Sequence, residues 1–267
     1  MRAIAWVLAM LGLSAGGAAA EPLKLYAAGS LKAAFGEVAA DFEKAGGPAV
    51  AATFGASGLL RGRIEGGERA DVFASADMAH PLKLAKAGKA GPVALFARNE
   101  LCALARPGLE VSPATLLDAM LRDGVRLGTS TPKADPSGDY AWKLFGRAEA
   151  ARPGSFAKLD AKALKLTGGP DTAKAPEGRN TYGWVMGEGK ADLFLTYCTN
   201  ALLAKAEVPD LQVVAVPGNL AVGADYGLTV LNDAPPEAWR LALYVLSPEG
   251  QAVLARHGFK VAGVPEG

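Results

Sequence analysis

Residues 23–42 read LKLYAAGSLKAAFGEVAADF, and this stretch decides the fold. The apolar run over residues 23–28 predicts a strand, Gly29 and Ser30 predict a tight turn, and residues 31–42 have the pattern of a helix. The first N–H groups of such a helix, and the positive end of its dipole, point at whatever lies in front of the turn. We therefore expect an anion-binding corner at Ser30.

A second copy of this pattern follows directly. Residues 49–54 predict a strand, and Gly55, Ala56, Ser57 and Gly58 lead into a helix over residues 59–65. A serine thus lies again where a helix begins, so that two corners can face one small anion. The alternative interpretation is a structural one, in which both serines are ordinary helix N-caps, the commonest use of serine at such a turn.

The first twenty residues predict export. Arg2 supplies a positive n-region, residues 4–13 an apolar h-region, and residues 16–20 a small-residue cleavage site, so we expect a signal peptide over residues 1–20, cut after Ala20. The mature protein is then periplasmic. Removing Arg2 lowers the formal net charge from +1 to 0. A neutral chain has no general basic field for nucleic acid or an anionic membrane surface, so we expect a small partner.

Short β-like runs alternate with helical patterns along the chain, which predicts an α/β fold with mostly parallel sheets. The expected strands are residues 23–28, 49–54, 72–76, 100–105, 127–130, 193–197, 211–216 and 226–231. The expected helices, besides residues 59–65, are residues 31–42, 81–87, 113–122, 139–150 and 236–257. Residues 164–179 are rich in Gly, Pro, Thr and Lys and predict an extended surface loop.

The two cysteines, Cys102 and Cys198, both lie in or beside strand-like runs. An oxidising compartment and an even number of cysteines favour a disulfide between them. Two separately buried thiols are the alternative, because sequence alone does not bring the two Cα atoms within reach.

Five segments carry a resemblance to a known family. The order and spacing of LYAAGSL (residues 25–31), FGASG (54–58) and ADVFASAD (70–77) resemble the periplasmic molybdate-binding proteins of ABC importers. Residues 193–201 are similar to that family's tyrosine-bearing strand. Residues 246–259 are similar to the C-terminal helix of many solute-binding proteins.

The resemblance implies a type II periplasmic-binding fold, in which two α/β lobes are joined by two crossing strands. We expect residues 21–95 plus 225–267 to form lobe I and residues 96–224 to form lobe II. A ligand would lie in the interlobe cleft, and hinge closure on that ligand would present a closed lobe pair to a permease.

The family's ligand-binding residues map onto five positions. Hydroxyl donors map onto Ser30, Ser57 and Tyr197, and backbone N–H donors map onto Ser137 and Thr181. Neutral donors of this kind can solvate a buried tetrahedral dianion without a lysine or arginine. The resemblance implies no catalytic residue, no cofactor and no metal cation, with molybdate or tungstate as the transported ligand.

The second lobe departs from the family pattern. Ser137 and Asp139 stand where small apolar residues are expected, and a carboxylate near a dianion would repel it. The loop before the tyrosine strand is long and carries Arg179, a charged donor that could reach the site. In the same loop, Tyr182 is the alternative to Thr181 as the backbone donor.

We therefore expect a monomeric periplasmic receptor that captures molybdate or tungstate and delivers it to an ABC permease in the inner membrane. A receptor for another small anion or polar solute is the main alternative. An exported hydrolase would need Ser57 as nucleophile and His257 as its base. An adhesion or scaffolding protein would expose an apolar patch instead. Asp71 and Asp77 fit caps or hinge contacts better than an acid/base pair.

Overall fold

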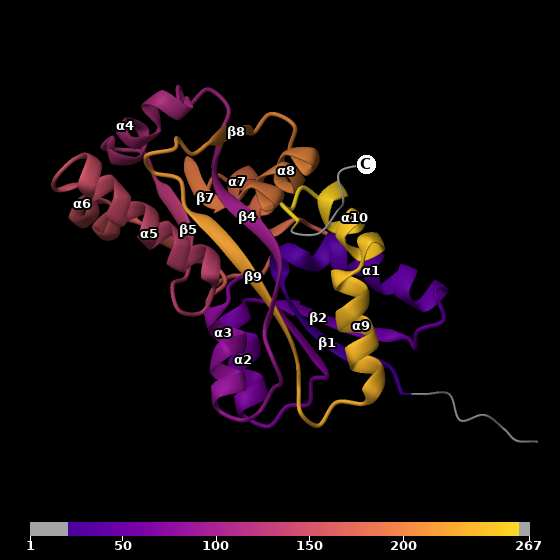
Figure 1. Ribbon diagram of the computed structural model, residues 1–267. Coiled ribbons are helices and arrows are strands. Elements are labelled where there is room, and N and C mark those ends of the chain that lie inside the picture. The colour runs from indigo at the N-terminus through magenta and orange to yellow at the C-terminus, as the bar shows by residue number, and fades with distance from the viewer. Residues whose placement is uncertain (1–20, 262–267) are drawn as a thin grey trace, which may run out of the picture.

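The computed structural model describes residues 21–261 and shows a mixed α/β protein (Figure 1). The predicted signal peptide and its cleavage site at Ala20 lie outside these residues. Within the described range, no helix combines the length and the apolar character needed to cross a membrane.

Within residues 21–261, nine strands form one curled sheet in the order β2-β1-β3-β9-β4-β7-β5-β6, with β8 also paired to β4. The strands are β1 Leu23–Ala28, β2 Val50–Gly55, β3 Val72–Ser75, β4 Ala94–Ala105, β5 Leu127–Ser130, β6 Leu164–Thr167, β7 Leu193–Tyr197, β8 Gln212–Ala215 and β9 Gly223–Val230. β1 is parallel to β2 and β3, and β5 is parallel to β6 and β7. The sheet is therefore parallel toward both of its ends.

Two long antiparallel strands, β4 and β9, connect the two ends of the sheet. Residues 94–100 of β4 pair with β9, whereas residues 101–105 pair with β7 and β8. β9 in turn pairs with β3 through residues 227–230. Figure 1 shows both strands crossing the middle of the molecule.

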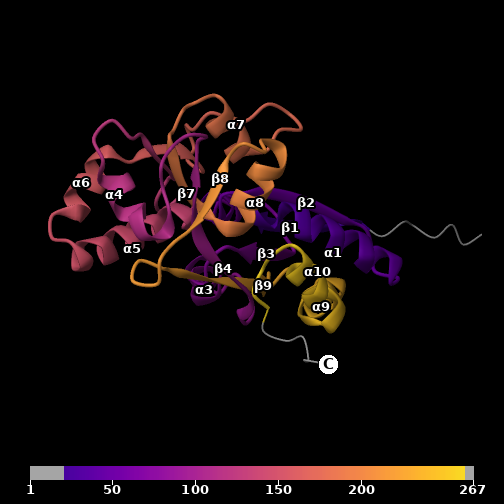
Figure 2. The ribbon, with the colours of Figure 1, turned by 90° about the horizontal axis from the view of Figure 1, so that it is seen from above.

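Helices gather at both ends of the sheet. They are α1 Lys32–Lys44, α2 Ser57–Glu65, α3 Ala79–Lys86, α4 Leu116–Leu121, α5 Pro136–Ala151, α6 Ser155–Lys162, α7 Thr181–Gly187, α8 Cys198–Glu207, α9 Pro236–Leu246 and α10 Pro248–Arg256. Short 3₁₀ turns precede α1 (Gly29–Leu31) and α4 (Pro113–Thr115). Figure 2 shows α1, α9 and α10 on one side and α4, α5 and α6 on the other.

Two sequence expectations are wrong. The single helix expected over residues 236–257 is divided into α9 and α10 at Ser247, whose backbone is extended because the following Pro248 disfavours a helical conformation there. Residues 164–167, expected to belong to a surface loop, form β6 and pair with β5. The helices α6, α7 and α8 were not among the expected helices.

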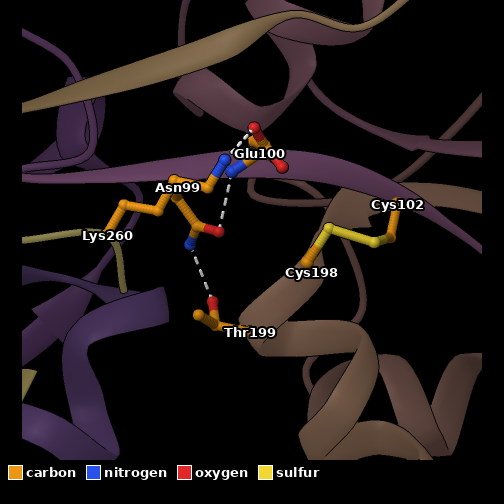
Figure 3. Close-up of a disulfide and its surroundings, with 6 residues drawn as sticks. All are labelled: Asn99, Glu100, Cys102, Cys198, Thr199 and Lys260. Atoms are coloured by element: carbon orange, nitrogen blue, oxygen red, sulfur yellow. Dashed lines mark hydrogen bonds and ion pairs between the residues drawn. A yellow bond between two sulfur atoms is a disulfide. The ribbon is translucent and has the colours of Figure 1, made fainter. Parts of the chain in front are cut away.

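The expected disulfide is present. Cys102 on β4 and Cys198 at the start of α8 are bonded, with their Cα atoms 4.8 Å apart. The bond joins β4 to α8 just beyond the part of β4 that pairs with β9 (Figure 3).

Candidate functional site

Two of the predicted site residues meet at the main chain of Ala76. The Ser57 hydroxyl accepts a hydrogen bond from the Ala76 N–H at 3.1 Å, and the Tyr197 hydroxyl donates to the Ala76 carbonyl at 3.2 Å. Both side chains are buried. Ser57 begins α2 and Tyr197 ends β7, so this contact joins the two ends of the sheet.

Ser30 joins this group of side chains through Tyr226 on β9. We refer to Ser30, Ser57, Tyr197 and Tyr226 as the cluster. The Ser30 hydroxyl lies 2.9 Å from the Tyr226 hydroxyl. The Tyr226 ring lies 5.5 Å from the Tyr197 ring, and the Tyr140 ring of α5 lies 6.3 Å from Tyr197, centroid to centroid. Serines from two separate strand-to-helix corners thus surround one group of buried tyrosines.

The start of α2 contacts the segment that leads into α5. The Gly58 N–H donates to the Ala134 carbonyl at 2.8 Å. A Cβ atom at Gly58 would lie 2.4 Å from the Lys133 carbonyl oxygen, so only glycine permits this approach. Ser137, in the first turn of α5, is buried, and its Oγ has no hydrogen-bond partner among residues 21–261.

The N-cap interpretation of Ser30 and Ser57 is wrong. The residue before the 3₁₀ turn that contains Ser30 is Ala28, and the N-cap of α2 is Ala56; neither turn has a side-chain cap within the described residues. The two serine hydroxyls bond instead to Tyr226 and to Ala76. The Ser30 turn and α2 therefore lack a side-chain cap, and the Gly58 N–H of α2 is paired with the Ala134 carbonyl instead.

The start of α5 differs, because Asp135 is its N-cap. The Asp135 carboxylate accepts the Ser137 N–H at 3.0 Å, and this N–H is the backbone donor that the resemblance assigned to the ligand. Burial raises the pKa of Asp135 to about 6, the Ser137 N–H and Ser130 hydroxyl oppose that shift, and Asp139 and Asp77 add to it. Ser137 can therefore offer its hydroxyl, while its N–H is engaged.

Asp139 and Arg179, the two charged residues that depart from the family pattern, lie in different places. Asp139 accepts the Lys133 N–H at 2.9 Å, and burial raises the pKa of Asp139 with a further contribution from Asp77. Arg179 bonds to Glu207 at the last residue of α8, with Nε 2.6 Å from the carboxylate. Tyr197 precedes the other end of that helix, roughly 15 Å away at 1.5 Å per residue. Arg179 is therefore engaged with Glu207 at the end of α8 opposite Tyr197.

At the start of α7, Tyr182 lies nearer to the cluster than its neighbours in sequence. Asn180 caps α7 by accepting the N–H groups of Tyr182 and Gly183 at 3.0 and 2.9 Å. The Tyr182 hydroxyl lies among the hydroxyls of Thr196, Ser130 and Thr167, and burial raises its pKa to about 12. Thr181 is partly buried at the first position of α7, and no hydrogen bond within residues 21–261 joins it to the other four predicted residues.

The groups that act on Tyr197 electrostatically are anions or phenols. Burial is the largest cause that raises the pKa of Tyr197, and Tyr226, Asp135, Tyr140 and Asp77 raise it further. A phenol with a raised pKa remains protonated, so Tyr197 stays a hydrogen-bond donor at neutral pH. The cluster therefore consists of hydroxyl donors with carboxylates at its margin.

The base that the hydrolase alternative requires is engaged elsewhere. His257 Nε2 lies 2.8 Å from a Glu37 carboxylate oxygen on α1, whereas Ser57 bonds to Ala76. Asp71 accepts the Lys24 N–H at 2.7 Å, and Asp77 accepts the His80 N–H at 3.0 Å at the start of α3, so both carboxylates make structural contacts as expected. No cluster of three His, Cys, Asp or Glu side chains within residues 21–261 could bind a metal ion.

Sequence reasoning missed the roles of Asp135 and Tyr226, and it named Tyr182 only as an alternative backbone donor. Asp135 had a usable signal, because Asp followed by Pro is the pattern of an N-cap and the first helical position. Tyr182 and Tyr226 had none, because their positions depend on side chains from distant strands.

A family model described as bacterial extracellular solute-binding protein matches residues 23–260. An uncharacterized protein of Pasteurella multocida is 38% identical over 77% of this chain and 85% of its own length. The molybdate-binding protein of Mycobacterium bovis is 27% identical over 90% of this chain and 85% of its own length.

Two solved structures share the fold at low sequence identity. The periplasmic molybdate-binding protein of Azotobacter vinelandii aligns over 90% of this chain and 100% of its own, with 22% identity and a TM-score of 0.73. The sulfate-binding protein of Mycobacterium tuberculosis aligns over 90% of this chain and 87% of its own, with 19% identity and a TM-score of 0.73. The expected type II periplasmic-binding fold is therefore confirmed.

Proposed function

The chain belongs to the bacterial extracellular solute-binding protein family, and we propose that it captures a tetrahedral oxyanion, molybdate or tungstate, for an ABC permease. We assign the ligand to the space between two lobes, residues 21–95 plus 225–267 and residues 96–224, with β4 and β9 crossing between them. The protein would act in the periplasm as a monomer, without a cofactor and without catalysis.

The meeting of Ser57 and Tyr197 at Ala76 carries this proposal. These two hydroxyls come from opposite ends of the sheet, so one small ligand between them contacts both lobes. Ser30, the Ser137 hydroxyl and the Thr181 N–H at the start of α7 complete the proposed donor set, since the alternative backbone donor, the Tyr182 N–H, is already donated to Asn180. The 27% identity to a molybdate-binding protein supports the choice of ligand.

Isothermal titration of the mature protein with molybdate, tungstate, sulfate and phosphate tests the proposal. We expect molybdate and tungstate to bind, and Ser57→Ala and Tyr197→Phe each to weaken binding by about 10- to 100-fold, the worth of a hydrogen bond to a charged group. Ser155→Ala is the matched control, because Ser155 is equally buried but lies on α6. Small-angle scattering of the same samples should show compaction with molybdate.

A different small anion or polar solute is the second candidate. Asp135 favours it, because its carboxylate accepts the Ser137 N–H in the place of a ligand oxygen. Absence of heat with all four anions would overturn the oxyanion proposal. The same titration with small hydroxylated solutes would then identify the ligand class.

A further inference from the structure

Ser30 belongs to a chain of hydrogen bonds that extends to the crossing strand β4. The Ser30 hydroxyl lies 2.9 Å from the Tyr226 hydroxyl, and the Asn99 Nδ2 group lies 3.4 Å from the same Tyr226 oxygen. All three side chains are buried, with Tyr226 fully enclosed. They come from three separate elements: the turn after β1, β9 and β4.

The orientation of the Asn99 amide is fixed on both sides. Its Oδ1 atom accepts the Glu100 N–H at 2.9 Å, and its Nδ2 group donates to the Thr199 hydroxyl at 2.8 Å (Figure 3). The disulfide at Cys198, directly before Thr199, joins the start of α8 to β4 and keeps this acceptor in place. Asn99 therefore presents an N–H group, and not a carbonyl, to Tyr226.

This orientation determines the direction of the remaining bonds. An amide NH₂ group can only donate, so the Tyr226 oxygen accepts from Asn99. Either hydroxyl of the Ser30–Tyr226 pair has the geometry to donate, but the Tyr226 hydrogen has no other acceptor among residues 21–261, so we infer that it is directed at the Ser30 oxygen. With that oxygen accepting, the hydrogen of Ser30 remains for another acceptor.

We propose that Asn99 and Tyr226 are positioning residues that orient the Ser30 hydroxyl as a donor to the bound anion. The proposal rests on the proposed oxyanion-binding function. A fully deprotonated oxyanion only accepts hydrogen bonds, so a serine that presented its lone pairs would repel it. Successive donors also polarise one another, which strengthens the last bond of the chain.

Tyr226→Phe is the direct test, measured as the dissociation constant for molybdate. Loss of the hydroxyl releases the Ser30 hydrogen to rotate, and we expect binding to weaken by about 10-fold, the lower end for a bond to a charged group. The matched control is Tyr26→Phe, because Tyr26 is a buried tyrosine on β1 whose hydroxyl bonds to Glu68 and Arg63 and not to the cluster. Its dissociation constant should change less than about 2-fold.

A double-mutant cycle separates orientation from mere packing. If Tyr226 acts through Ser30, Tyr226→Phe should change affinity less than about 2-fold in the Ser30→Ala protein. Additive effects of the two substitutions would overturn the inference. Thermal unfolding of each variant identifies any that does not fold.

Asn99→Asp tests the direction of the hydrogen-bond chain from its Asn99 end. It replaces Tyr226→Phe as the test if that variant does not fold. A carboxylate accepts the Tyr226 hydrogen and so reverses the chain, and we expect weakening of more than about 10-fold. Part of that effect is the added charge. The charge effect persists in the Ser30→Ala protein, whereas the effect of direction disappears there.

The outcomes distinguish this inference from the proposed function. If the wild-type protein binds none of molybdate, tungstate, sulfate or phosphate, the proposed function fails and the inference fails with it. If the wild type binds molybdate and Tyr226→Phe binds it equally well, the inference alone is overturned.

Discussion

The helix starts of the β1–β3 region and of the β5–β7 region are built differently. In the first region, α2 begins after Ala56 without a side-chain cap, and the same is true of the turn that contains Ser30. In the second region, Asp135 caps α5 and Asn180 caps α7. Neither Ser30 nor Ser57 accepts a helix N–H as a cap, so the first region offers serine hydroxyls to an anion, whereas at α5 and α7 side-chain oxygens already accept backbone N–H groups.

Three links within the β5–β7 region can be removed one at a time. They are the Cys102–Cys198 disulfide, the Asp135 cap and the Arg179–Glu207 ion pair. The first region thus offers serine hydroxyls to a ligand, whereas backbone donors at the helix starts of the second region are already paired within the protein. Removing the disulfide, the Asp135 cap and the ion pair one at a time tests how much each contributes to stability and to ligand binding.

The disulfide should have the largest effect. It spans 96 residues, and Cys102→Ser/Cys198→Ser should lower the free energy of unfolding by about 2–5 kcal/mol, because the unfolded chain gains freedom when so long a loop opens. Denaturant unfolding measures this change. Hydrogen exchange should rise in β7 and α8, while β1 and β2 stay protected.

Reductant provides the control for this variant. Added to the wild-type protein, it should reproduce the unfolding curve of the double variant, and added to the variant it should change nothing. A uniform rise in exchange across both regions would contradict the view that the cross-link stabilises the second region in particular.

The Asp135 cap should have an intermediate effect. Asn is as good an N-cap as Asp, so Asp135→Asn keeps the helix start and removes only the charge. We expect this variant to bind molybdate about 10-fold more tightly than the wild type near neutral pH, because a carboxylate no longer faces the anion. Asp139→Asn is the control, because Asp139 bonds to the Lys133 N–H and not to Ser137.

The pH dependence gives this prediction its sign. The pKa of Asp135 is about 6 in the folded protein, above its ordinary value of 3.8, so the folded state binds more protons between these values. The contribution of Asp135 therefore lowers the free energy of unfolding as pH rises through this window, and the loss is complete above about pH 6. Molybdate affinity should fall through the same pKa, and both trends should be flatter in Asp135→Asn. Equal pH profiles in the two proteins would contradict this assignment.

The parts of the site that sequence predicted are those specified by local pattern. The corners at Ser30 and Ser57 each lie within one strand–turn–helix segment of about twenty residues, so spacing alone places them. β4 was expected only from residue 100, because Arg98 and Asn99 in its first half do not resemble a buried strand. That half is a strand because it pairs with β9, more than a hundred residues away.

The difference between local pattern and long-range pairing also explains most of the site contacts that sequence did not predict. Asp135 is an exception, because its Asp-Pro cap pattern is local and the cap was still not predicted. Tyr226 was placed in the correct strand, but its bond to Ser30 follows from strand pairing that no local pattern encodes. The partner of Arg179 likewise depends on how α7 packs against α8.

The Arg179–Glu207 ion pair should have the smallest effect. The pair lies at the last residue of α8 with both side chains partly exposed, so Arg179→Ala should change the free energy of unfolding by less than about 1 kcal/mol. The dissociation constant for molybdate should change less than about 2-fold, because Arg179 is paired with Glu207 at the end of α8 opposite Tyr197. Glu207→Gln is its matched control, since it breaks the same pair from the other side. If Arg179→Ala weakened binding 10-fold while Glu207→Gln did not, Arg179 would be a ligand donor. The second region would then supply a cation to the anion, which contradicts the proposal that neutral groups alone bind it.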